Sequence, residues 1–340
     1  TTPTATTPTA TTPTATTPTA TTPTATTPTT TTIVTVTRIR TIVPGPPVSP
    51  TIRLRLSGLF TLHGAHVSVP RRRTTVELTI HPYVTGQRMS VTESLDGRRF
   101  RRLRVLARCV GPHEGRLRLS VAAPGAGRVT VAVRHRPGRT MRAFKAHAVF
   151  AALRTAVQLG SRGRFVELVQ QRLAALHLFI AQTGVFDQGT QLALDAYHRL
   201  LGQGEGNVSL SPATLTKLLD GVGSFHVRYP RQGEHAEGDL SDQVIAFIDG
   251  SQVHWIFPIS SGKPSTPTIR GRFQVYYKEP EYTSDGMYFS SFFHGGYAIH
   301  GYDPAPDYPA SHGCMRLPMA DAIPAYGWMS VGDWVDTYYK

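Results

Sequence analysis

The chain of 340 residues is 40% hydrophobic and 17% charged, which is ordinary for globular protein, and this length predicts two or three domains. No apolar run is long enough to predict a membrane-spanning helix, and no charged-then-apolar export signal opens the chain, so we expect any signal or membrane anchor to precede Thr1. The net charge of +14 arises in residues 33–150, which hold 22 Lys and Arg against 4 Asp and Glu.

This basic segment predicts an anionic partner, because clustered cations attract a polyanion by charge alone. The arginines are accompanied by no nucleic-acid-binding motif and no aromatic stacking platform. Nucleic acid is therefore not an expected partner.

Residues 1–32 repeat Thr-Thr-Pro-Thr-Ala with a period of five and predict a disordered tail. Regular prolines favour extended polyproline II over helix, and this composition cannot bury a core. Two interpretations stay open, namely a spacer and an unselected low-complexity tail.

Residues 33–155 predict an immunoglobulin-like β-sandwich. Apolar and polar residues alternate at 52–56, 75–80, 116–121 and 129–133, and turn pairs lie at 96–97, 124–125 and 137–138. The arginines alternate with the core residues, so they lie either on a solvated face or on a polymer-binding surface. Cys109, in an apolar stretch, is expected to be a buried core thiol and not a disulfide partner of Cys314.

Residues 160–222 predict a small three-helix domain. Apolar residues recur at helical spacing over 165–176, and a turn over 183–190 leads into a second helix over 191–201. Ser211 caps a third helix, with Pro212 in its first turn, that ends at Leu219.

Residues 224–340 predict a second, mostly-β domain. Strands are expected at 243–248, 252–259, 271–277, 287–293, 297–300 and 333–338, and Asp249-Gly250 predicts a type I′ hairpin turn. The aromatic segment 277–293 is expected to be either a flap over a site or a hairpin at a solvent edge.

The chemistry is expected in the tetrapeptide Ser311-His312-Gly313-Cys314, with His300 upstream. A thiol with an ordinary pKa of about 8.5 is mostly protonated at neutral pH, although the thiolate is the nucleophile. A nearby imidazole that takes the proton converts this cysteine into an acylating group.

These residues resemble the L,D-transpeptidases of bacterial cell walls, the YkuD family. The family pattern is a histidine, a loop of a dozen or so residues, and Ser/Thr-His-Gly-Cys followed closely by Arg or Asn. Residues 260–268, which contain Gly262-Lys263, and residues 271–275 resemble its early turn and the following strand. The resemblance covers residues 224–340 and implies the family's mostly-β catalytic domain.

The three-helix segment resembles the peptidoglycan-binding domain that precedes such enzymes. It departs from the usual pattern at Val169, at His177-Leu178 and at Tyr197. These changes leave two interpretations open, a sugar-binding module and a structural bridge.

The resemblance implies a role for each residue of the site. Cys314 is the expected nucleophile, and His300 is the general base, oriented by the main-chain carbonyl of Gly301. The N–H groups of Gly313 and Cys314 are candidate oxyanion donors, and His312 lines the pocket. Substrate binding is assigned to the following residues: Ser311, which orders the loop, Arg316, Tyr297, Tyr302 and Met287.

The implied reaction is a 3→3 cross-link between peptidoglycan stem peptides through a cysteinyl thioester that carbapenems also form. Two alternatives stay open: an L,D-carboxypeptidase, and a non-catalytic wall-binding protein. Sortase is disfavoured because its arginine lies far downstream of its cysteine. The expected partners are stem peptides, glycan and anionic wall polymers in an extracytoplasmic, wall-associated location. No cofactor is expected, and His294, His300, His312 and Cys314 match no standard zinc spacing.

Overall fold

The computed structural model describes residues 46–204 and 208–340. The predicted Thr/Pro tail at 1–32 and the first residues of the predicted sandwich lie outside these ranges. No helix in the described part of the chain is both long and apolar enough to span a membrane.

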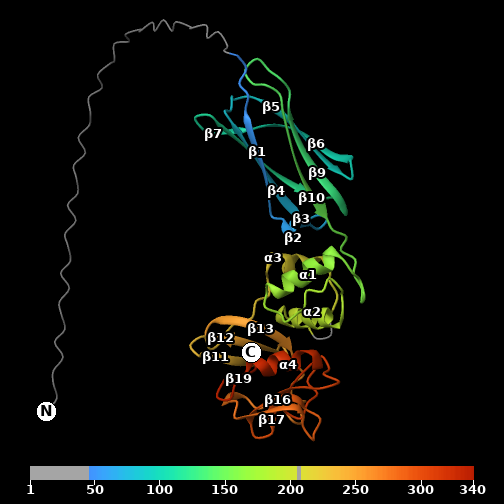
Figure 1. Cartoon of the computed structure of the whole chain (residues 1–340), viewed down its shortest axis with the longest axis vertical. Coiled ribbons are helices and arrows are strands. Elements are labelled where there is room, and N and C mark those ends of the chain that lie inside the picture. Colours follow the sequence, from blue (N-terminus) through green and yellow to red (C-terminus); the bar gives the residue numbers. More distant parts are fainter. Residues whose placement is uncertain (1–45, 205–207) are drawn as a thin grey trace, which may run out of the picture. The chain divides into compact units, whose positions relative to one another are not determined.

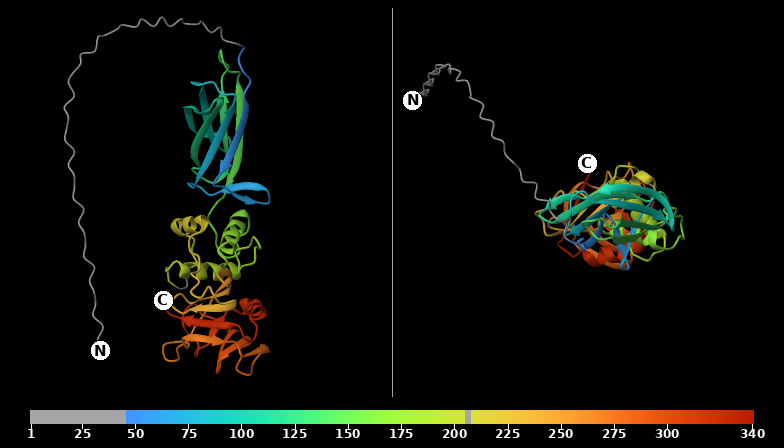
Figure 2. Two further views of the ribbon diagram at one scale, coloured as in Figure 1. Left: turned by 90° about the vertical axis from the view of Figure 1, so that its left-hand side faces the viewer. Right: turned by 90° about the horizontal axis from the view of Figure 1, so that it is seen from above.

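Residues 51–152 form two antiparallel-rich sheets that share one core (Figures 1 and 2). In β4 every second residue is buried, as the alternating pattern at 75–80 predicted, and β5 shows the same alternation. The first sheet has the order β1 (Thr51–Ser57), β4 (Arg73–His81), β8 (Glu114–Ala122), β7 (Arg108–Gly111). The second has the order β2 (Phe60–Leu62), β3 (Ala65–Ser68), β10 (Phe144–Ala152), β9 (Gly127–His135), β5 (Arg88–Leu95), β6 (Arg98–Leu106). The immunoglobulin type of this sandwich stays a prediction.

Cys109 is exposed, so its predicted burial in the core is wrong. The residue lies on β7, a short strand at the edge of its sheet, where three of the four residues face solvent. Its thiol donates to the Gly111 carbonyl at 3.2 Å. Apolar neighbours in the sequence do not ensure burial where a strand has a sheet partner on one side only.

Three helices follow the sandwich: α1 (Arg164–Ala174), α2 (Gln188–Leu200) and α3 (Pro212–Asp220). Gln170 on α1 is fully buried, and its amide bonds to Thr183, Gly184 and Val185 of the turn before α2 and to Thr190 in the first turn of α2. Asp187 and Ser211 cap α2 and α3 through their side-chain oxygens. Three helices are present as predicted, and their peptidoglycan-binding role stays a prediction.

The C-terminal region is mostly β, with two sheets and one helix, α4 (Met319–Trp328), which contacts β16 and β17 (Figure 1). A shared core contains Phe247, Phe257, Met315 and Val335. One sheet has the order β13 (Gln252–Pro258), β12 (Val244–Asp249), β11 (Glu234–Asp239), β19 (Trp334–Tyr338), β14 (Gly271–Gln274). The other has the order β15 (Tyr277–Tyr282), β16 (Tyr288–His294), β17 (Tyr297–Gly301), β18 (Met315–Leu317).

The hairpin between β12 and β13 is confirmed, but its predicted turn type is wrong. Asp249 pairs with Gln252, so the two loop residues are Gly250 and Ser251. Only Gly250 has a positive φ, of 57°, whereas a type I′ turn needs positive φ at both central residues.

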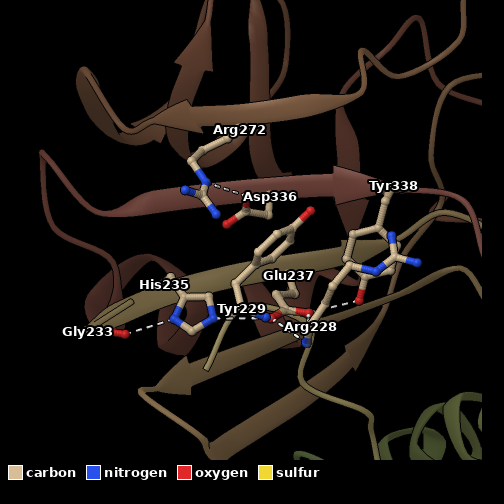
Figure 3. Close-up of polar contacts among 8 residues, drawn as sticks. All are labelled: Arg228, Tyr229, Gly233, His235, Glu237, Arg272, Asp336 and Tyr338. Atoms are coloured by element: carbon tan, nitrogen blue, oxygen red, sulfur yellow. Dashed lines mark hydrogen bonds and ion pairs between the residues drawn. The ribbon is translucent and has the colours of Figure 1, made fainter. Parts of the chain in front are cut away.

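A buried polar network ties the segment before β11 to the first of these sheets (Figure 3). Glu237 accepts hydrogen bonds from the N–H groups of Arg228 and Tyr229 and from the Tyr338 hydroxyl, at 2.8 to 3.0 Å. Burial alone would raise the pKa of Glu237, but these donors and His235 together lower it. The Glu237 carboxylate therefore fixes the backbone of residues 228 and 229, just before β11, against the sheet.

Candidate active site

Parallel pairing of β17 with β18 brings the predicted histidine and cysteine segments side by side. Ile299 lies opposite Met315 and His300 opposite Arg316, so Cys314 ends the loop that enters this pairing. The Cys314 thiol donates to the Gly296 carbonyl at 3.5 Å. Thus the strand that carries His300 and the turn before it, eighteen positions upstream of the cysteine, belong to the same site.

The ring of His300 is held in one tautomer. Its Nδ1 lies 2.9 Å from the Gly301 carbonyl, which can only accept, so Nδ1 carries the proton and Nε2 has a free lone pair. Gly301 thus orients the imidazole through its main chain, as the resemblance implied. This is the protonation pattern that a general base needs.

Burial makes both reacting groups neutral at rest. Burial, with a smaller contribution from the positive charge of Arg316, lowers the pKa of His300 to about 4, against the opposing effect of the Gly301 carbonyl. Burial also raises the pKa of the Cys314 thiol, only partly offset by the Ala298 backbone and Arg316. The resting site therefore holds a thiol beside a neutral imidazole, and not a thiolate–imidazolium pair.

Within residues 46–204 and 208–340, no hydrogen bond joins the Cys314 thiol to the His300 ring. Catalytic hydrogen bonds are often long or poorly aligned before substrate binds, and they shorten in the complex. Direct proton transfer is thus compatible with this site but is not preformed in it.

The buried Ser311 hydroxyl closes the loop around the cysteine. It donates to the Cys314 carbonyl at 2.6 Å and accepts from the Gly313 N–H at 3.0 Å. Its own N–H donates to the Ser261 carbonyl at 2.9 Å. Ser311 therefore orders the loop, as expected from the sequence.

The Gly313 N–H is consequently occupied, so its predicted role as an oxyanion donor does not fit this geometry. Gly313 is needed for its shape instead. Its φ is +125°, and an added Cβ would lie 2.3 Å from the Tyr297 ring. Of the two candidate donors, the Cys314 N–H is the one that fits.

Arg316 and Tyr302 form a stack beside His300. The Arg316 guanidinium lies 3.9 Å from the centre of the Tyr302 ring, and that ring meets the His300 ring edge-on at 5.9 Å between centroids. Arg316 also bonds weakly to the Ala310 carbonyl, at 3.5 Å. Both residues are half-buried, so the stack fixes one wall of the site.

His312 is exposed and lies on the outer side of the loop. Its Nε2 accepts from the Lys263 ammonium at 3.1 Å. Lys263 comes from the Gly-Lys turn, whose N–H at Lys263 donates to the Ser311 carbonyl. The turn noted in the sequence therefore lies directly against the cysteine loop and contributes a cation that was not among the predicted site residues.

Met287 is not brought to the cysteine by any contact in the described structure. It lies in the turn between β15 and β16, where its carbonyl accepts from the Thr283 N–H. The hairpin forms the edge of its sheet, and Lys278 anchors it to α4 through the Tyr326 and Met329 carbonyls. This geometry fits the edge hairpin better than the flap.

Gln243 is a further residue that the sequence did not reveal. Its side chain bonds to Ser261 through both its oxygen and its nitrogen, at 2.9 and 2.7 Å, and Ser261 in turn receives the Ser311 N–H. Arg199 of α2 donates to the Gln243 carbonyl at 2.7 Å. A buried chain of hydrogen bonds thus runs from the helices to the cysteine loop, and no local sequence motif predicts it.

In the described ranges, no group of three or more His, Cys, Asp or Glu side chains is arranged to hold a metal ion.

Comparisons with known proteins identify one family. Residues 234–336 match the family model described as the L,D-transpeptidase catalytic domain, YkuD. The chain is 30% identical to an L,D-transpeptidase from Xylanimonas cellulosilytica DSM 15894, covering 55% of this chain and 98% of that one, with a TM-score of 0.49. It is 26% identical to the catalytic domain of the E. faecium L,D-transpeptidase, covering 32% of this chain and 98% of that one, with a TM-score of 0.29. No curated protein matches the chain.

Proposed function

Since the chain belongs to the L,D-transpeptidase family, with its YkuD catalytic domain at residues 234–336, we propose that it forms 3→3 cross-links in peptidoglycan through an acyl group carried on Cys314. The observation that supports this most directly is the neutral, oriented imidazole of His300 on the strand that pairs beside Cys314.

In the first step, the Cys314 sulfur attacks the carbonyl at the L-centre of diaminopimelate in a tetrapeptide stem. His300 Nε2 takes the thiol proton and passes it to the leaving amine, so that D-Ala departs and a thioester remains. We assign stabilisation of the oxyanion to the Cys314 N–H, a contribution that typically changes turnover by about 10²–10³.

In the second step, the side-chain amine of another stem attacks the thioester, forms the new amide and releases the thiol. Attack by water in place of the amine would give a tripeptide, which is the L,D-carboxypeptidase reaction. Both reactions use the same acyl-enzyme and differ only in the acceptor.

The proposed setting is extracytoplasmic, because peptidoglycan is the substrate of the family. The proposed partners are stem peptides and glycan, with the helical module of α1–α3 as a candidate wall-binding unit. The basic sandwich would then lie among anionic wall polymers.

The test is intact-mass analysis of the full chain after incubation with meropenem, for the unmodified protein and for Cys314→Ala. We expect one adduct on the unmodified chain and none on the variant. Cys109→Ala is the matched control, because it removes the other thiol and should leave the adduct unchanged. Absence of an adduct on the unmodified chain would favour a non-catalytic wall-binding protein.

A second measurement separates the two acyl acceptors. The enzyme is incubated with a disaccharide–tetrapeptide, and products are resolved by mass spectrometry. Dimers that have lost one D-Ala support the transpeptidase, whereas tripeptide monomers alone identify a carboxypeptidase.

A further inference from the structure

The outward face of the six-stranded sheet in the sandwich carries cations on neighbouring strands. We define the cationic face by five exposed residues: Arg99, Arg102 and Arg104 of β6, Arg134 of β9 and Lys145 of β10. Figure 1 shows these strands within one sheet.

The register places these side chains on the same side. Ser90 of β5 lies opposite Arg104 on one flank and opposite Arg134 on the other, and Arg134 lies opposite Lys145. The residues on either side of Ser90, Met89 and Val91, are buried in the core. Because residues alternate between faces, Ser90 and the cations in register with it point away from the core.

This arrangement is unfavourable for the isolated sandwich. Arg134 and Lys145 lie directly opposite each other on adjacent strands, whose backbones are about 4.8 Å apart. Like charges in that position are destabilising. No Asp or Glu occupies an outward position on β5, β6, β9 or β10. Glu93 of β5 is buried on the core side, and Asp96 lies in a turn.

The other sheet shows the contrasting arrangement. On its outward face, Arg116 forms ion pairs with Glu77 at 3.2 Å and with Glu114 at 3.0 Å. Arg55 and Arg118 both lie opposite Glu77 in the register. That face also has more arginines than carboxylates, but Glu77 and Glu114 lie among them, whereas the cationic face holds no carboxylate.

We propose that the cationic face binds a linear polymer whose negative charges are phosphodiester groups and which carries no bases. Arginine provides the forked donor that matches a phosphate group, and four of the five cations are arginines. The outward positions of these four strands hold no Phe, Tyr or Trp on which bases could stack. The hydroxyl-bearing Thr92 lies opposite Arg102 and supplies a further donor.

The proposal is independent of the acyl-transfer chemistry, because none of these residues touches the catalytic domain's site. It makes the sandwich a second binding unit that holds the enzyme against an anionic polymer.

The experiment measures binding of the full chain to poly(glycerol phosphate) over a series of salt concentrations. One triple variant removes charge from the cationic face: Arg102→Gln, Arg104→Gln and Arg134→Gln. The matched control removes the same charge from the other sheet: Arg53→Gln, Arg55→Gln and Arg118→Gln. Circular dichroism and thermal unfolding report that the sandwich of each variant remains folded, and acylation by meropenem reports the same for the catalytic domain.

We expect the cationic-face variant to bind at least about tenfold more weakly. The slope of its log binding constant against log salt concentration should fall by the equivalent of about two to three phosphate contacts. The affinity of the control should change by less than about twofold. Equal losses in both variants would mean that net charge alone drives binding and would overturn the assignment, as would no binding by the unmodified chain. Polyglutamate bound as tightly would overturn the phosphodiester identity, and single-stranded DNA bound more tightly would point to nucleic acid instead.

Discussion

The two histidines of the catalytic site differ in almost every physical respect. His300 is buried, is held in one tautomer by the Gly301 carbonyl and has its pKa lowered to about 4. His312 is exposed and contacts the Lys263 ammonium, although it is only two residues from Cys314. The comparison teaches that environment, and not distance along the chain, decides which histidine can act as the base.

The largest expected effect is from His300. Replacing it with Gln removes the buried base, so acylation by meropenem should slow by at least about 10²-fold. His312→Gln is the matched control and should slow acylation by less than about fivefold. Stopped-flow fluorescence or timed mass analysis measures both rates. A larger loss for His312→Gln would reverse the assignment of the two histidines.

The second prediction concerns pH. Because the pKa of His300 is lowered to about 4, its base form is fully present above about pH 5 and is lost as the pH falls through 4. The acylation rate constant should therefore vary by less than about twofold between pH 5 and 7 and should halve near pH 4. A steep rise between pH 5 and 7 would instead indicate a base with an ordinary imidazole pKa.

Ser311 tests the loop that presents the cysteine. Ser311→Ala leaves the Gly313 N–H and one acceptor site of the Cys314 carbonyl without the hydroxyl, at a cost of about 1–3 kcal/mol. We expect a lower midpoint of thermal unfolding and acylation slower by about tenfold. Ser265→Ala, at an exposed position of the neighbouring turn, should change neither. Unchanged acylation in Ser311→Ala would show that the loop keeps its shape without this hydroxyl.

The smallest expected effect is from the exposed side of the site. Lys263→Gln removes a cation that can attract a substrate carboxylate, but exposed charges typically contribute only about 1 kcal/mol. KM for a tetrapeptide stem should rise by about three- to tenfold while kcat changes by less than twofold. Lys217→Gln on α3 is the control. A loss confined to kcat would place Lys263 in the chemical step.

Much of the fold could be predicted because its signals are local. Alternation in β4 and β9, the cap at Ser211 and the hairpin after β12 each depend on a few adjacent residues. The strand β18 and the helix α4 were not predicted. β18 has three residues, and α4 contains Pro324 and a weakly amphipathic apolar sequence, so neither carries a clear periodic pattern.

The position of β7 in its sheet explains the error at Cys109, and a local hydrogen bond explains the one at the Gly313 N–H. Edge position made Cys109 exposed in spite of its apolar neighbours. A hydroxyl two residues away occupied the Gly313 N–H, which its motif alone could not reveal.

By itself, the sequence determined the chemistry: one cysteine in a Ser-His-Gly-Cys loop, a histidine upstream and a basic N-terminal region are all readable as residue types at set spacings. Only the tertiary structure decided which histidine is buried, which N–H is occupied and which sheet face has no carboxylate among its arginines. The reason is physical, because burial and register arise from contacts between segments far apart in the chain, and these contacts set protonation, access and charge.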